Sequence, residues 1–221
     1  MKTLWTKGLL SFALLTCVAV APAGAALMDR GNGLIYDDDL NITWLEDANL
    51  AATNAFGVSG INADGSMRWG KANSWIAGMN AVNYKGFNNW RLPTTTQPDA
   101  TCSSQGLGGA GQDGGAGCTG SEMGHLYNVE GITAAAPGPL FDKVQTNIYW
   151  SGTVFAPNTS FAWNFRFDRG SQRFGVKRSE VFVWAVRSGD VSAPPVPEPS
   201  TMLLLGTGLA GLVAWRRKKA V

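Results

Sequence analysis

The sequence predicts an α+β domain with two short helices and small antiparallel sheets, flanked by an N-terminal signal helix and a C-terminal transmembrane helix. Three observations predict this class. Apolar residues recur at helical spacing in one central segment, short β-like runs fill the last third of the domain, and a strongly apolar stretch stands near each end of the chain. We therefore interpret residues 1–25 as a signal peptide, 26–190 as the domain, 191–200 as a Pro-rich linker, 201–215 as a transmembrane segment and 216–221 as a basic cytoplasmic tail.

Residues 1–25 have the three-part layout of a secretory signal peptide. Lys2 and Lys7 give it a positive start, residues 9–20 are almost wholly apolar, and residues 23–25 supply the small side chains that a signal peptidase requires. An ordinary buried helix is the alternative interpretation. Lipidation at Cys17 is rejected because the apolar run continues well past it.

The C-terminal segment is apolar but short. Residues 201–215 carry no charge, and at 1.5 Å per residue they reach about 22 Å, less than the ~30 Å hydrocarbon core of a bilayer. This length indicates a marginal or transient membrane segment. The four cations after it are expected to stay on the cytoplasmic side, and the prolines before it keep the linker extended.

The linker and the tail together closely resemble the PEP-CTERM sorting signal. Pro197, Glu198 and Pro199 form its motif, and an apolar run with a basic end follows. The resemblance implies processing by signal peptidase and an exosortase in a Gram-negative bacterium that makes exopolysaccharide. It also implies an inner-membrane precursor that reaches the cell surface or extracellular matrix after cleavage within residues 197–200. A simple C-terminal anchor is the alternative.

Composition changes once these end segments are set aside. Between Ala26 and Pro195 there are 12 Lys and Arg and 15 Asp and Glu residues, a net charge of −3. This balance does not fit a broad basic surface for nucleic acid, so no nucleic-acid partner is expected. Seven of the nine tryptophans lie in this part of the chain, which is enough to build an aromatic core.

Cys102 and Cys118 are the cysteines of the mature chain. In an exported protein such a pair is interpreted as a disulfide. It would close a loop of about fifteen residues, worth roughly 3 kcal/mol in the chain-entropy model. A zinc site is the alternative, but it would need more ligands, and the single histidine, His125, is interpreted as structural or surface-exposed.

The first half of the domain has two β-like runs, Leu34–Asp37 and Asn41–Leu45, and then one helix. Apolar residues at helical spacing predict that helix from Trp69 to about Asn80. Residues 95–120 have the composition of a loop, nearly structureless from Gly106 to Gly117.

A second short helix is expected after this loop. Thr119 and Glu122 have the spacing of a capping box, and Met123, Leu126 and Tyr127 follow at helical spacing.

The last third is rich in strands. The predicted strands are Ile148–Phe155, Ser160–Asp168, Ser171–Lys177 and Val181–Arg187, the last a central strand because it is apolar on both faces. A two-residue turn at Arg169-Gly170 places Phe165 opposite Phe174 and Trp163 opposite Val176, with these pairs facing the core. The same turn places Arg166 opposite Arg173, which is unfavourable unless an anion lies between them.

These runs resemble the Lcl C-terminal domain family over nearly all of residues 30–190. The resemblance is carried by Gly33–Asp37, Ile42–Trp44, the Trp69/Trp75 helix, Asn89–Thr94, Tyr149–Thr153 and Ala185–Arg187. Related formylglycine-generating-enzyme-like domains imply a C-type-lectin-like fold. In these families the WRLPT stretch runs almost directly into the second helix, so residues 95–120 form an inserted loop tied by the cysteines.

The sequence predicts no enzyme, no catalytic residues and no cofactor. It contains no Ser/His/Asp arrangement, HExxH helix, Walker loop or dinucleotide fingerprint, and no cysteine follows Cys118 to supply the reactive pair of the formylglycine-generating relatives. Asp37, Asp38 and Asp39 are of the type that binds calcium, but no EF-hand-type loop surrounds them. They are interpreted as an acidic turn, and no metal ligand is assigned.

The expected function is non-catalytic binding of extracellular polysaccharide, or adhesion. The candidate glycan-binding residues are Arg166, Arg169, Arg173 and Lys177, together with Arg178 and exposed Trp and Tyr faces. Guanidinium groups suit carboxylates and sulfates, and aromatic rings suit the C–H faces of sugars. The alternative is a structural biofilm or surface-coat protein with no discrete ligand.

Overall fold

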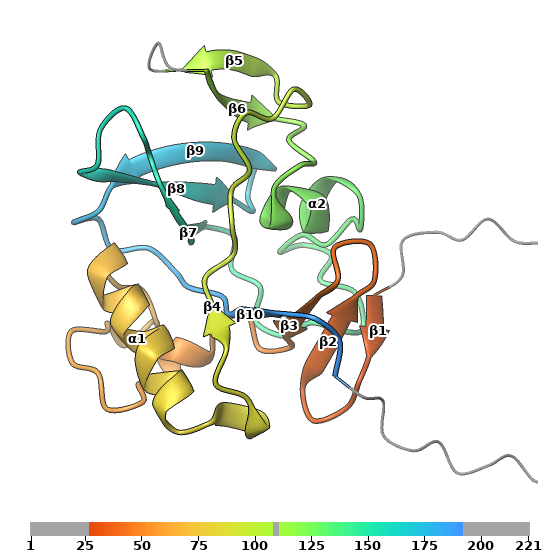
Figure 1. Cartoon of the computed structure of the whole chain (residues 1–221). Helices are drawn as coiled ribbons and strands as arrows, with labels where there is room; N and C mark the ends of the chain where they lie inside the picture. The colour runs from red at the N-terminus through yellow and green to blue at the C-terminus, as the bar shows by residue number, and fades with distance from the viewer. Residues whose placement is uncertain (1–26, 108–110, 192–221) are drawn as a thin grey trace, which may run out of the picture.

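The computed structural model describes residues 27–107 and 111–191, and this part of the chain has two five-stranded sheets beside two α-helices (Figure 1). The first sheet has the spatial order β1 (Leu27–Asp29), β2 (Leu34–Asp37), β3 (Ile42–Leu45), β10 (Val186–Ser188) and β4 (Trp90–Arg91). The second has the order β5 (Ser104–Leu107), β6 (Gln112–Ala116), β9 (Ser171–Val176), β8 (Phe161–Arg166) and β7 (Ile148–Val154). The helices are α1 (Trp69–Ala81) and α2 (Glu122–Asn128), with 3₁₀ turns η1 (Leu50–Ala52) and η2 (Tyr84–Gly86).

All strand pairs of these two sheets are antiparallel, so the predicted α+β class is confirmed. None of the helices in residues 27–107 and 111–191 has the length and apolar character needed to cross a membrane. The predicted signal helix and the predicted transmembrane segment at 201–215 lie outside the described residues.

The first helix and the first hairpin form where the sequence predicts them. In α1, Ala72, Trp75 and Met79 are buried on one face, which packs against β4 and β7. The strands β2 and β3 pair with Ile35 opposite Trp44. These elements could be predicted because the spacing of apolar residues within each one defines the face that it buries.

The second helix is also present, but the predicted capping box is wrong. Ser121, not Thr119, is the N-cap residue, and it makes no side-chain hydrogen bond to the helix. The Glu122 carboxylate turns away from the helix end. It accepts two hydrogen bonds from the Arg91 guanidinium, at 2.7 and 2.6 Å, and one from the Thr94 backbone N–H at 2.7 Å. A bidentate ion pair outweighs the weaker contact of a capping box.

The β8–β9 hairpin is present, but its register differs from the predicted one. Trp163 lies opposite Phe174 and Phe165 lies opposite Gln172, a shift of two residues. The connection therefore spans residues 167–170, and the predicted two-residue turn is wrong.

Packing at the connection explains this shift. Phe167 is buried, and its backbone N–H donates to the Asn147 carbonyl at 2.9 Å, which draws the chain away from the β8–β9 ladder. Gly170 has a φ of +60°, and a Cβ there would lie 2.2 Å from the Tyr127 ring. The connection therefore fits tightly against α2, and only glycine is accommodated at its last position.

The predicted strand Val181–Arg187 is continuous in sequence but not in the fold. Val181 pairs with Met67 and Phe182 with Tyr149 as isolated bridges, and only Val186–Ser188 forms a strand. That strand, β10, lies between β3 and β4, so the expected interior position is confirmed for it. The segment is apolar on both faces because it passes from the second sheet to the first.

Trp184 lies at the centre of this crossing. The rings of Trp44, Phe141, Tyr149 and Phe167 surround it at centroid separations between 5.1 and 5.8 Å. Its indole N–H donates to the Leu45 carbonyl at 2.7 Å. One side chain thus contacts both sheets and satisfies a buried backbone acceptor.

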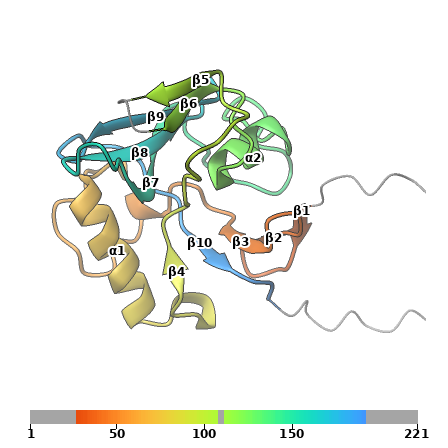
Figure 2. The same cartoon turned by 45° about the horizontal axis from the view of Figure 1, so that its top comes forward.

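The two ends of the described chain meet at one side of the molecule. β1 and the end of β10 lie on the same side in Figure 2. The Arg30 guanidinium holds the Asp190 carboxylate through two hydrogen bonds of 2.8 Å.

We predict that Trp184→Phe lowers the free energy of unfolding by about 1–3 kcal/mol. The variant leaves the Leu45 carbonyl without its donor and leaves a cavity beside the smaller ring. Urea denaturation followed by fluorescence and circular dichroism measures the change. Val82→Ala, at a side chain that is 59% exposed, is the control and is expected to stay within about 0.5 kcal/mol of the parent. Equal effects from both variants would contradict the central role of Trp184.

Candidate functional site

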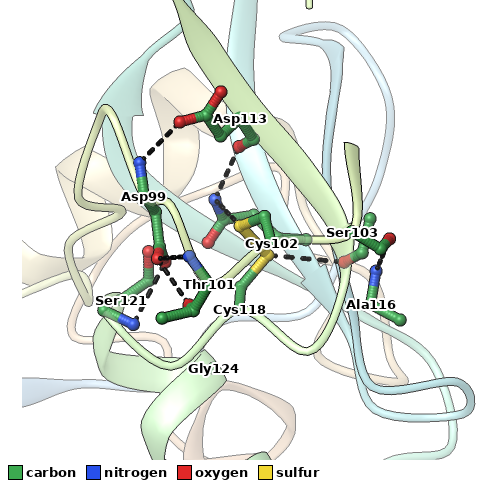
Figure 3. The surroundings of a disulfide bond; sticks show 12 residues. Asp99, Thr101, Cys102, Ser103, Asp113, Ala116, Cys118, Ser121 and Gly124 are labelled. Carbon is green, nitrogen blue, oxygen red and sulfur yellow. Dashed lines mark hydrogen bonds between the residues drawn. A yellow bond between two sulfur atoms is a disulfide. The ribbon is translucent and has the colours of Figure 1, made fainter. Parts of the chain in front are cut away.

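The inserted segment between WRLPT and α2 is a folded hairpin tied by a disulfide (Figure 3). Cys102 and Cys118 are bonded to each other across a sequence separation of 16, as predicted. The expectation of a loop across residues 95–120 is wrong for two stretches, because Ser104–Leu107 and Gln112–Ala116 pair as β5 and β6.

Two buried carboxylates order this glycine-rich segment. Asp99 accepts hydrogen bonds from the backbone N–H groups of Thr101 at 3.1 Å and Gly120 at 3.0 Å. Asp113 accepts from the N–H groups of Asp99 at 2.8 Å and Gly106 at 3.0 Å. Figure 3 shows both aspartates near the disulfide, Asp113 above it and Asp99 to its left. The segment has few apolar side chains to bury. Hydrogen bonds from its backbone N–H groups to these two buried carboxylates stabilise it instead.

The hairpin extends the second sheet. β6 pairs with the start of β9, with Gly115 opposite Gln172 and Ala116 opposite Ser171, and the Gln172 side chain donates to the Asp113 carbonyl at 3.0 Å. Among the described residues of the hairpin none pairs with β9 beyond Gln172, so the edge of β9 is unpaired by them there.

A pocket of about 410 Å³ lies at this open edge. Its lining residues are Ser104, Gly115, Gln172, Arg173 and Phe174. Phe174 was expected to face the core with Phe165, but it is 37% exposed and stacks on Phe155 with ring centroids 3.9 Å apart. The expected core position is wrong because β6 covers only the first residues of β9.

A second pocket, of about 490 Å³, lies where β9 ends. Ser160, Phe161, Val176, Lys177 and Arg178 line it. The Lys177 ammonium lies 4.2 Å from the centre of the Trp69 ring, a cation–π distance. The Trp69 indole donates to the Ser151 carbonyl at 2.8 Å, which fixes the ring beneath the lysine.

The structure divides the predicted basic cluster into three places. Arg173 lies in the first pocket and Lys177 in the second. Arg166 and Arg169 lie at the β8–β9 connection, where Arg166 binds both oxygens of Asp168 at 3.1 and 2.9 Å and Arg169 approaches the same carboxylate at 3.4 Å. The hydrogen bond from Arg166 lowers the pKa of Asp168. These two arginines are therefore already paired.

The predicted contact between Arg166 and Arg173 does not form. Arg166 lies opposite Ser171 and Arg173 lies opposite Asn164, because of the shifted register. No anion is needed between them.

The expectation of exposed tryptophan faces is also wrong for most of the described tryptophans. Six of the seven in residues 27–107 and 111–191 are buried, and Trp69 is half-buried under Lys177. Sequence reasoning missed Ser104, Gln172 and Phe174 as pocket residues. The family resemblance located the insertion between WRLPT and the second helix, but no sequence signal showed that it would pair with β9.

Of the other sequence-predicted features, the acidic turn and His125 lie within the described residues, and the sorting motif does not. The acidic turn at Asp37–Asp39 joins β2 to β3, where Asp37 is buried and accepts a hydrogen bond from the Leu40 N–H at 3.1 Å. His125 is buried on α2. The sorting motif Pro197, Glu198 and Pro199 lies outside the described residues.

The fold and the site define an antiparallel α+β domain with a basic, partly aromatic surface along one strand. Residues 33–187 match the model of the Lcl C-terminal domain, and the chain belongs to that family. Residues 195–218 match the PEP-CTERM protein-sorting motif. This motif implies a secreted, membrane-transiting protein that an exosortase processes. No curated protein matches the chain.

We predict that replacing both Cys102 and Cys118 with Ser lowers the free energy of unfolding by about 3 kcal/mol, because the open chain regains the entropy of a loop with a sequence separation of 16. Amide exchange should accelerate most in β5 and β6. Hydrogen–deuterium exchange and thermal denaturation measure both effects, and reduction of the parent protein is the control that should reproduce them. Unchanged exchange in both strands would show that Asp99 and Asp113 hold the hairpin by themselves.

Proposed function

We propose that this domain binds acidic extracellular polysaccharide at the surface or in the extracellular matrix of a Gram-negative bacterium, without catalysing a reaction. The observation that carries the proposal is the pocket at the inserted hairpin, where Arg173 stands beside exposed Phe174. A guanidinium group makes paired hydrogen bonds with a carboxylate or sulfate. A phenyl ring packs against the C–H faces of a sugar.

The lack of carboxylate partners for Arg173 and Arg178 supports binding of an external anion. Within residues 27–107 and 111–191, no carboxylate lies in ion-pair range of Arg173 or Arg178. Arg166, by contrast, is held by Asp168. Binding an external anion costs less free energy for an unpaired exposed guanidinium than for one that must first break its ion pair with a carboxylate of the protein.

The two pockets suit one extended ligand. Arg173 and Lys177 are separated by four positions, which is about 13 Å along an extended chain. Ser104 and Gln172 add neutral hydrogen-bonding groups next to the first cation. A polymer with repeated negative charges can therefore contact both pockets at once.

The pocket residues are binding groups. Among the described residues that line either pocket there are hydroxyl, amide, aromatic and cationic side chains, and no carboxylate pair for general acid and base chemistry.

The proposal also includes a C-type-lectin-like relationship for the fold, which the two helices beside small antiparallel sheets support.

We predict that Arg173→Ala weakens binding of a carboxylated or sulfated polysaccharide about tenfold, equivalent to about 1.4 kcal/mol. The expected loss is that of one charge-assisted contact at a partly exposed site. Calorimetric titration with alginate and with dextran sulfate measures it, and raising the salt concentration should reduce the difference.

Arg169→Ala is the matched control for this experiment. It removes the same exposed charge from the same hairpin, but beside Asp168 and away from both pockets, so its effect should stay below about twofold. Equal losses from the two variants would mean that net charge alone, and not the pocket, attracts the polymer. Failure to bind any polysaccharide would favour a structural biofilm or surface-coat role.

The sorting motif supports the place of action in this proposal. A domain that an exosortase releases from its tail would meet polysaccharide outside the cell. The matched motif at residues 195–218 carries this step.

We predict that replacing Pro197, Glu198 and Pro199 together with Ala keeps the tail on the protein. In a host that has an exosortase, the intact mass of the parent should show loss of the C-terminal segment, whereas the variant should keep it and fractionate with the membrane. Changing Pro194 to Ala alters the same linker outside the matched residues 195–218 and serves as the control. Tail removal from the triple variant would show that cleavage does not depend on this motif.

A further inference from the structure

We propose that Asp37, His125 and Glu130 bind a divalent transition-metal ion of the zinc type, with Asp39 beside them. The donor atoms of the three residues all lie within 4.8 Å of one another. This cluster shares no residue with either β9 pocket.

Separate elements bring these side chains together. Asp37 is the last residue of β2, His125 lies in the middle of α2, and Glu130 follows two residues after α2 ends. The Glu130 backbone N–H donates to the His125 carbonyl at 3.2 Å, which turns the glutamate back toward the histidine. The Nε2 atom of His125 lies 3.6 Å from the Glu130 Oε1 atom and 3.6 Å from the Asp39 Oδ2 atom.

Two buried atoms in this cluster lack hydrogen-bond partners. His125 Nε2 and Glu130 Oε1 are both inaccessible and have no hydrogen bond to any described residue. The side chain of Glu130 is 6% exposed and that of His125 is 11% exposed. Buried polar atoms are ordinarily satisfied. Here a nitrogen and an oxygen face the same space, which distinguishes the cluster from an ordinary group of surface acids.

The composition of the cluster suits a cation. Asp37, Asp39 and Glu130 bring three carboxylates around one imidazole. A divalent ion bound there would coordinate the unpartnered Glu130 oxygen and the unpartnered His125 nitrogen.

The ligand types and spacing select the class of ion. Zinc bonds to histidine nitrogen and carboxylate oxygen are about 2.0–2.2 Å, so adjacent ligands of a tetrahedral site lie about 3.4 Å apart. The 3.6 Å separations from His125 are close to this value. Calcium and magnesium prefer an all-oxygen shell, whereas imidazole suits zinc, copper, iron and nickel.

Asp37 is already oriented for this role. Its carboxylate accepts hydrogen bonds from the Leu40 N–H at 3.1 Å and from the Trp44 indole N–H at 3.5 Å. Such outer contacts fix the direction of a ligating carboxylate. The proposal departs from the sequence expectation, in which the turn at Asp37–Asp39 was structural and no metal ligand was assigned, because the histidine comes from a distant segment.

The test is calorimetric titration of the untagged full-length chain with Zn²⁺ after treatment with a chelator. One equivalent should bind, the thermal midpoint should rise, and Co²⁺ should give the visible absorption of a tetrahedral site. His125→Gln and Glu130→Gln should each weaken Zn²⁺ binding on the order of 100-fold. Both replacements are close in size, so the chelated variants should melt near the chelated parent.

Glu180→Gln is the matched control, because it neutralises an exposed carboxylate that accepts a hydrogen bond from Asn62 and is not part of the cluster. It should bind Zn²⁺ like the parent. Three outcomes overturn the proposal: no stoichiometric Zn²⁺ binding, unchanged binding by both cluster variants, or binding of Ca²⁺ in preference to Zn²⁺. None of these outcomes bears on polysaccharide binding, since Arg173 is outside the cluster.

Discussion

The packing of Trp184 between the two sheets is the interaction on which the rest of the structure depends. The segment that carries it bridges to Tyr149 of β7 at Phe182 and then enters the first sheet as β10. The Trp184 ring contacts Trp44 of the first sheet and Tyr149 of the second, so the two sheets share one set of buried aromatic side chains. The shared aromatic cluster therefore sets the relative position of the sheets, and with it the positions of the β9 pockets and of the β2–α2 cluster.

A different kind of stabilisation holds the insertion. The hairpin between Cys102 and Cys118 has almost no apolar side chains of its own, so burial contributes little to its order. The disulfide limits its open conformations, and Asp99 and Asp113 bind its backbone N–H groups. An insertion built in this way can line the first β9 pocket without competing for the core.

How far the sequence predicted the structure depends on the range of the interactions involved. α1 and the β2–β3 hairpin were predictable because their own residue periods define their buried faces. The β8–β9 register was not, because burial of Phe167 against the rest of the core decides where the strands separate. β5 and β6 depend on side-chain-to-backbone bonds and on pairing with β9, neither of which leaves a pattern in sequence. Asp37 is distant in sequence from His125 and Glu130, and the packing of α2 brings them together. No local sequence motif could therefore predict the cluster.

The ion pair between Arg30 and Asp190 closes the domain at the point where the chain enters and leaves it. Asp190 and Val191 are the last described residues, and Val191 is buried against the core. The contacts reported for the described residues therefore end at Val191, the first residue of the predicted linker. Cleavage at the sorting motif, six or more residues further along the chain, would leave all of these contacts within the released domain.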